Sequence, residues 1–185
     1  MIKKYKQFVL ENINSEVKIE NISDSDIPEI LNFCAKIFGE AQGSEEEVKE
    51  FLGSDVDFTI SKKATVDGKI VGCYLFNEDS VADFLENCDC TLEDVNKYKN
   101  LKGIQGCALA VIPEYRNKDI GRKLREVPLK MGYDYIWGQH LKGLHNVDNW
   151  TKFGRRLVAD GDINGEDMWV TLMDLKWKLK DIQIS

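Results

Sequence analysis

Residues 107–125, CALAVIPEYRNKDIGRKLR, decide how most of the chain can be interpreted. The first six, 107–112, form an unbroken apolar run that is typical of a strand buried on both faces, and Pro113 ends it because proline cannot donate to a ladder. A polar loop with two cations, Arg116 and Lys118, follows, and from residue 120 apolar residues recur at the spacing of one helical face. A strand, a cationic loop and a helix N-terminus together can hold phosphate, although a solvated turn has the same pattern.

The same stretch resembles the acyl-CoA-binding motif of the GNAT superfamily of acyl-CoA-dependent N-acetyltransferases. In that family a central strand runs into V-x-P-x-Y-R and then into R-x-x-G-x-G/A at a helix start. The residues that match are Val111, Pro113, Tyr115, Arg116, Ile120 and Gly121. Asp119 departs from the motif, because the family usually has glycine at this position.

The order of elements along the chain is also that of the GNAT fold. Residues 103–112, 120–131 and 133–141 read as strand, helix and strand, so the two strands should be parallel with a right-handed crossover. The remaining expected elements are a strand at 17–22, helices at 23–39, 44–53 and 146–153, and hairpins at 58–76 and 157–177. The fold class we expect is α/β (α+β): a GNAT-like mixed, mostly antiparallel sheet with helices on both faces. The resemblance implies that its one central parallel pair is splayed to hold CoA.

We divide the chain into an N-terminal extension, 1–16, and a single GNAT-like domain, 17–185. Residues 77–102 form an insertion between the third and fourth strands, in which Thr91 can cap a helix. Insertions beside a site often act as lids, whereas many are only surface excursions.

Composition restricts the class of protein further. The 185 residues carry a formal net charge of −7, which argues against nucleic acid or anionic membranes as partners. No apolar run approaches the roughly 18 residues of a membrane span. Five cysteines without a secretion signal suggest reduced thiols, and Cys88-x-Cys90 lacks the spacing and histidines of a zinc site, so we expect no metal. We expect a cytoplasmic protein, with homodimer formation left open.

The resemblance implies where acetyl-CoA would bind as co-substrate. The pantetheine arm would pair with the strand backbone at Leu109, Ala110 and Val111. The pyrophosphate would lie on the N–H groups of Asn117, Lys118, Asp119, Ile120, Gly121 and Arg122, with charge from Arg116, Lys118 and Arg122. Asn146 and Asn149 would face the pantetheine amides, or serve only in capping and solvation. Asp119 can cap the helix start and so compete with phosphate for its donors.

The groups that usually catalyse this reaction in the family are missing at the matching positions. Many members have a glutamate on the central strand, but here Gln105 can hydrogen-bond without taking a proton. Many have a tyrosine acid in the last helix, a position that falls on Phe153. Glu78 borders the presumed acyl end without being singled out. His140 and His145 follow the second parallel strand and should lie toward the pyrophosphate end.

Three functions remain open. The first is an N-acetyltransferase that moves the acetyl group of acetyl-CoA to a primary amine of a small molecule or peptide. The second is a non-catalytic acyl-CoA-binding module that acts as a sensor or interaction protein. The third is a phosphate-binding α/β domain unrelated to CoA, which close pairing of the two parallel strands along their length would favour.

Overall fold

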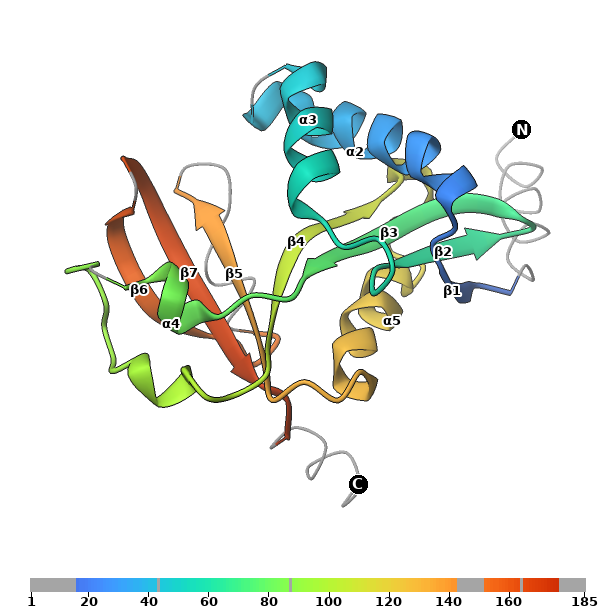
Figure 1. Cartoon of the computed structure of the whole chain (residues 1–185). Coiled ribbons are helices and arrows are strands. Elements are labelled where there is room, and N and C mark those ends of the chain that lie inside the picture. Colours follow the sequence, from blue (N-terminus) through green and yellow to red (C-terminus); the bar gives the residue numbers. More distant parts are fainter. Residues whose placement is uncertain (1–15, 43, 87, 143–151, 164, 177–185) are drawn as a thin grey trace, which may run out of the picture.

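The computed structural model describes residues 16–42, 44–86, 88–142, 152–163 and 165–176 (Figure 1). The expected N-terminal extension therefore lies almost wholly outside the described residues. Seven strands form one sheet in the order β1-β2-β3-β4-β5-β7-β6. The strands are β1 Lys18–Asn21, β2 Lys62–Val66, β3 Lys69–Asn77, β4 Gly103–Val111, β5 Tyr135–Leu141, β6 Arg156–Ile163 and β7 Glu166–Asp174.

Helices cover both faces of the β3–β4 half of the sheet, as expected for this fold class (Figure 1). On one face lie α2, Ile27–Gln42, which follows a 3-10 turn at Asp24–Asp26, and α3, Glu45–Asp55. The other face carries α5, Ile120–Glu126, and the 3-10 turn η4, Val127–Lys130. None of the helices within the described residues is long and apolar enough to cross a membrane.

The parallel pair in the middle of the sheet is splayed. β4 and β5 are parallel, and they are in register at only three positions, from Gly103↔Tyr135 to Gln105↔Trp137. Every other neighbouring pair of strands in the sheet is antiparallel. A register shift between Leu75 and Phe76 of β3 marks a bulge in the β3–β4 ladder, close to the point where β4 leaves β5. The splay is confirmed, and the close pairing that a domain unrelated to CoA would show is absent from the described strands.

Local signals predicted several element boundaries. Ser44 caps α3 in a capping box with Glu47, and the hairpin of β2 and β3 turns at Asp67-Gly68, both with positive φ. Pro128 falls within the helix expected at 120–131, and proline bends or ends a helix because it lacks the N–H of the helical hydrogen bond. Indeed α5 stops at Glu126 and the chain continues as the 3-10 turn that contains Pro128.

Other boundaries were wrong. The first long helix does not end at Gly39 but runs to Gln42. The first hairpin strand starts at Lys62 rather than at residue 58, because Asp57 accepts a hydrogen bond from the Thr59 amide at 2.8 Å and holds a turn there.

The insertion, 77–102, differs most from expectation. No helix starts at Thr91, which instead forms a β-bridge with Ala159 of β6. The helix of the insertion is α4, Val81–Phe84, whose N-cap is Ser80, and a 3-10 turn follows at Asn96–Tyr98. Buried side chains of the insertion pack on the face of the sheet that carries Tyr135 and Trp137. The insertion therefore supplies a hydrophobic core for the β5–β7 half of the sheet.

Candidate functional site

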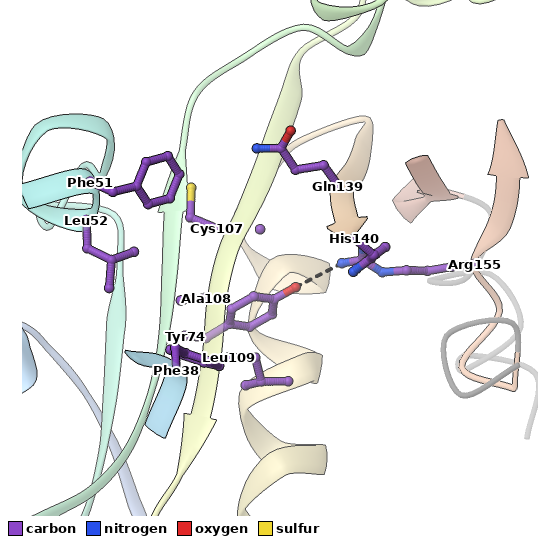
Figure 2. Close-up of a pocket in the computed structure, with 11 residues that line it drawn as sticks. Phe38, Phe51, Leu52, Tyr74, Cys107, Ala108, Leu109, Gln139, His140 and Arg155 are labelled. Atoms are coloured by element: carbon purple, nitrogen blue, oxygen red, sulfur yellow. Dashed lines mark hydrogen bonds between the residues drawn. The ribbon is translucent and has the colours of Figure 1, made fainter. Parts of the chain in front are cut away.

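A narrow cavity of about 80 Å³ passes between β4 and β5 beyond the last registered pair (Figure 2). Phe51 and Leu52 of α3 line one end, and Tyr74 of β3 with Arg155 line the other. The cavity thus connects the face of the sheet that carries α3 with the side on which Arg155 lies. Because a splayed strand pair leaves backbone groups of β4 open on one edge, an extended ligand can pair there as an added strand.

A wider cavity of about 380 Å³ adjoins it on the α3 side. The two cavities share Phe51, Cys107 and Gln139, so they form one continuous cleft. The other residues that line the wide cavity are Glu47, Val48, Gln105, Leu141, Glu166 and Met168. Burial raises the pKa of the Cys107 thiol to about 12, so this thiol stays protonated near neutral pH and is not a ready nucleophile.

The loop between β4 and α5 borders a depression of about 440 Å³. Two non-glycine residues of the loop have positive φ, Asn117 at 62° and Asp119 at 67°. This left-handed conformation at Asp119 accounts for the glycine that the family usually has there, because glycine adopts it without strain. The depression is lined by Val111, Tyr115, Arg116, Asn117, Asp119, Gly121, Arg122 and Arg125.

Asp119 does not cap α5 as expected. Its side chain makes no capping hydrogen bond and instead pairs with Arg122, whose Nε lies 2.6 Å from Oδ1. This bond to Arg122 lowers the pKa of the Asp119 carboxyl. Arg122 is also held by Glu126, at 2.5 Å between Nη1 and Oε1. Two carboxylates therefore hold the guanidinium that the sequence had assigned to the pyrophosphate.

Arg125 is a cation of this depression that the sequence analysis did not single out. Its guanidinium lies 3.9 Å from the ring centroid of Phe153, and its Nε is buried without a hydrogen-bond partner among the described residues. Burial lowers its pKa. The sequence did contain a signal for Arg125: it follows Gly121 by four residues, and this spacing places both residues on the same face of the helix.

The other expected cofactor residues are placed as follows. Leu109, Ala110 and Val111 belong to the part of β4 beyond its registered pairing with β5, and the Val111 carbonyl accepts a bond from Arg116 Nε at 3.3 Å. Lys118 lies over the ring of Tyr115, 4.8 Å from its centroid, and outside the lining of the depression. Ile120 is buried in the core beneath α5. Asn146 and Asn149 lie outside the described residues.

The expected catalytic candidates are dispersed. Gln105 lines the wide cavity, whereas Phe153 stacks on Arg125 and lines neither cavity. Glu78 accepts a hydrogen bond from Tyr133 and lies 3.5 Å from Lys102. It is thus engaged beside the three registered pairs rather than in the cleft.

His140, which was expected toward the pyrophosphate end, lines the narrow cavity together with Leu109. His145 lies outside the described residues. Tyr74 and Arg155 were missed altogether. They are 81 residues apart, and Arg155 Nη2 donates to the Tyr74 hydroxyl at 2.9 Å (Figure 2). No local pattern could have paired them.

Comparison with known proteins agrees with this geometry. No protein-family model matches the chain, and no curated protein matches it by sequence. Among solved structures, the polyamine N-acetyltransferase of Drosophila melanogaster superposes with a TM-score of 0.65 at 15% identity, covering 86% of this chain and all of that one. PaiA N-acetyltransferase of Thermoplasma acidophilum, solved with coenzyme A, gives 0.56 at 14% identity, with coverage of 86% and 99%.

The ribosomal-protein-S18-alanine N-acetyltransferase of Escherichia coli gives a TM-score of 0.55 at 16% identity, covering 86% of this chain and 94% of that one. At such low identity, these superpositions establish a shared fold and nothing further. Those enzymes, the splayed β4–β5 pair and the seven-stranded mixed sheet lead to one assignment: the chain has the fold of the GNAT N-acetyltransferases.

Proposed function

We propose that the chain is an N-acetyltransferase, which transfers the acetyl group of acetyl-CoA to a primary amine of a small molecule or peptide. The observation that carries this proposal is the cleft at the splay, because it joins the two faces of the sheet where β4 and β5 separate. A thioester reaching the splay from one side can there meet an amine that enters from the other. N-acetyltransferases with the same fold support the reaction class.

On the cofactor side, the pantetheine arm runs along the open edge of β4 at Leu109, Ala110 and Val111. The pyrophosphate lies in the depression over the N-terminus of α5, where free N–H groups and the helix dipole favour negative charge. Gly121 lets the phosphate oxygens approach the backbone, and Arg116 and Arg125 border the same depression. Arg122 can join them only by leaving its two carboxylate partners.

On the acceptor side, the amine enters through the wide cavity. Phe51, Leu141 and Met168 supply an apolar wall, and the exposed Glu47 and Glu166 lie in the same lining. Gln105 and Gln139 present amides that can hold the amine by hydrogen bonds. Since an amide cannot take its proton, the amine is deprotonated through water. Holding the two reactants in line can itself lower the barrier by roughly 7–11 kcal/mol.

Release of CoA thiol from acetyl-CoA in the presence of a broad panel of primary amines tests the proposal. We expect at least one amine to accelerate thiol release by the wild-type protein, whereas Gly121→Glu, in which pyrophosphate binding is disrupted, shows only the background rate. A wild-type protein that binds acetyl-CoA but transfers it to no amine would instead be an acyl-CoA-binding module, an alternative that the amide of Gln105 on β4 favours.

A further inference from the structure

The hydroxyl of Tyr74 packs against Gly106, the first residue of β4 beyond the registered pairs. Gln105↔Trp137 is the last pair of β4 with β5, and Gly106 follows. A Cβ at Gly106 would lie 2.6 Å from the Tyr74 hydroxyl oxygen, far too close for any side chain. Tyr74 is 3% exposed and lines the narrow cavity. Its hydroxyl is therefore located at the point where the two strands separate.

On β5, the guanidinium of Arg155 packs in the same way against Gly138, the residue after Trp137. A Cβ at Gly138 would lie 3.1 Å from Arg155 Nη1 and 3.3 Å from the Gly106 carbonyl oxygen. Arg155 Nη2 donates to the Tyr74 hydroxyl at 2.9 Å, and Nη1 donates to Thr171 Oγ1 at 3.3 Å. Glycine on each strand thus leaves room for this phenol–guanidinium pair, whose members line the cavity side by side (Figure 2).

The direction of that hydrogen bond matters for chemistry. Since a guanidinium only donates, the Tyr74 oxygen accepts from Arg155, and its own hydrogen remains for another acceptor. Burial raises the pKa of Tyr74, while the charge of Arg155 acts in the opposite sense, so the phenol is protonated at neutral pH. A donor with an adjacent cation is suited to an atom on which negative charge develops.

We infer that Tyr74 donates a proton to the departing sulfur of acetyl-CoA and that Arg155 is the positioning residue that stabilises the resulting phenolate. This role rests on the acetyltransferase function proposed above. As the N–C bond forms and the C–S bond breaks, the Tyr74 proton passes to sulfur and gives the free thiol. The proton that the attacking amine loses passes through water and restores the phenol. Acetyl-CoA and amine thereby become amide and CoA, with no other reactant.

The pair could alternatively serve only to join the two halves of the sheet, because Tyr74 belongs to β3 and Arg155 directly precedes β6. The two roles differ in what a variant loses. A purely structural bond affects stability and the affinity for acetyl-CoA. A proton donor affects the rate of acetyl transfer after binding and its response to solvent deuterium.

The test is single-turnover acetyl transfer by Tyr74→Phe, with Tyr133→Phe as the matched control, since Tyr133 donates to Glu78 and lines neither cavity. We expect Tyr74→Phe to transfer acetyl about 100-fold more slowly, at the low end for a lost general acid because a thiolate is a tolerable leaving group. Its affinity for acetyl-CoA should stay within about twofold, and its solvent deuterium isotope effect should be smaller than that of the wild type, because only the amine proton is then transferred. Tyr133→Phe should keep both the rate and the isotope effect.

A second variant, Arg155→Lys, keeps a cation but not the forked geometry, and should slow transfer on the order of tenfold without changing acetyl-CoA affinity. If Tyr74→Phe does not fold, a wild-type isotope effect of one together with unchanged transfer by Arg155→Lys overturns the inference. Equal rates of acetyl transfer by Tyr74→Phe and the wild type would overturn the inference about Tyr74 but not the proposed acetyltransferase function. A wild-type protein that binds acetyl-CoA without transferring it to any amine overturns both.

Discussion

The two ends of the β4–β5 pair each have a buried tyrosine, and these two tyrosines have opposite hydrogen-bonding roles. At the registered end, Tyr133 donates to the carboxylate of Glu78, with Lys102 stacked 4.5 Å from the ring centroid. At the splayed end, Tyr74 accepts from Arg155. The first hydroxyl donates its hydrogen to a carboxylate, whereas the second donates to no acceptor among the residues that the structure describes. The comparison separates a registered end, where the tyrosine bond lies within the fold, from a splayed end, where we propose that acetyl-CoA binds and reacts.

The largest effect should come from the loop at the splayed end. Gly121→Glu should weaken acetyl-CoA binding at least about 100-fold, because the side chain blocks the approach of the phosphates and its carboxylate repels them. Titration calorimetry measures the loss. The unfolding free energy should change little, since a Cβ at Gly121 meets only Arg125, at 3.6 Å.

The matched control is Gly53→Glu, the same substitution in α3, where nothing lies within 4 Å of an added Cβ. It should bind acetyl-CoA as the wild type does. If Gly121→Glu binds acetyl-CoA with unchanged affinity, this loop is not the pyrophosphate site. The proposed difference in function between the registered and splayed ends of the β4–β5 pair would then also be wrong.

At the registered end, Tyr133→Phe should lower the unfolding free energy by about 1–2 kcal/mol, because a buried hydrogen bond to a charged group is lost. Urea denaturation measures the change. Glu78→Gln, which keeps an acceptor for the hydroxyl, should lose less. If Tyr133→Phe is as stable as the wild type, this end of the pair is not held by the tyrosine.

Asp119→Gly should tighten acetyl-CoA binding about two- to fivefold, since it removes a charge from the phosphate site and frees Arg122. The unfolding free energy should stay within about 0.5 kcal/mol, because no cap is lost and glycine adopts a φ of 67° without strain.

Glu126→Gln weakens the other hold on Arg122 without altering the loop, and should give a smaller gain. Weaker binding by Asp119→Gly would mean that the ion pair orders the loop for CoA rather than competing with it.

The smallest effect concerns alkaline pH. Burial and the bond to Glu78 raise the pKa of Tyr133, so its contribution to stability is present below the unfolded pKa of about 10 and decreases as pH rises above it. The stability difference between wild type and Tyr133→Phe should therefore narrow by about 0.4 kcal/mol between pH 8 and pH 10. Denaturation curves at the two pH values measure this difference. A constant difference would mean that Tyr133 titrates alike in both states.

Much of this architecture could be predicted from local sequence. Asp67-Gly68 predicted a hairpin turn because both residues tolerate positive φ, and Ser44 predicted a cap because its hydroxyl accepts the bond from the Glu47 amide, at 3.2 Å. Four of the residues that match the GNAT motif, Val111, Tyr115, Arg116 and Gly121, line the depression at the start of α5. These features depend on neighbours within a few residues.

The features that could not be predicted depend on distant residues. Thr91 has a suitable side chain for a helix cap, but a β-bridge to Ala159 of β6 determines its conformation. At Asp119 the expected capping bond is replaced by an ion pair with Arg122. The pair of Tyr74 and Arg155 forms only when the two halves of the sheet meet.

Isothermal titration of the wild-type protein with acetyl-CoA tests the central claim most directly, because the claim is that the splayed end of the β4–β5 pair holds this molecule. We predict saturable binding of one acetyl-CoA per chain, weakened at least about 100-fold by Gly121→Glu and unchanged by Gly53→Glu. The absence of binding by the wild type at millimolar acetyl-CoA, or equal binding by all three proteins, would contradict the account.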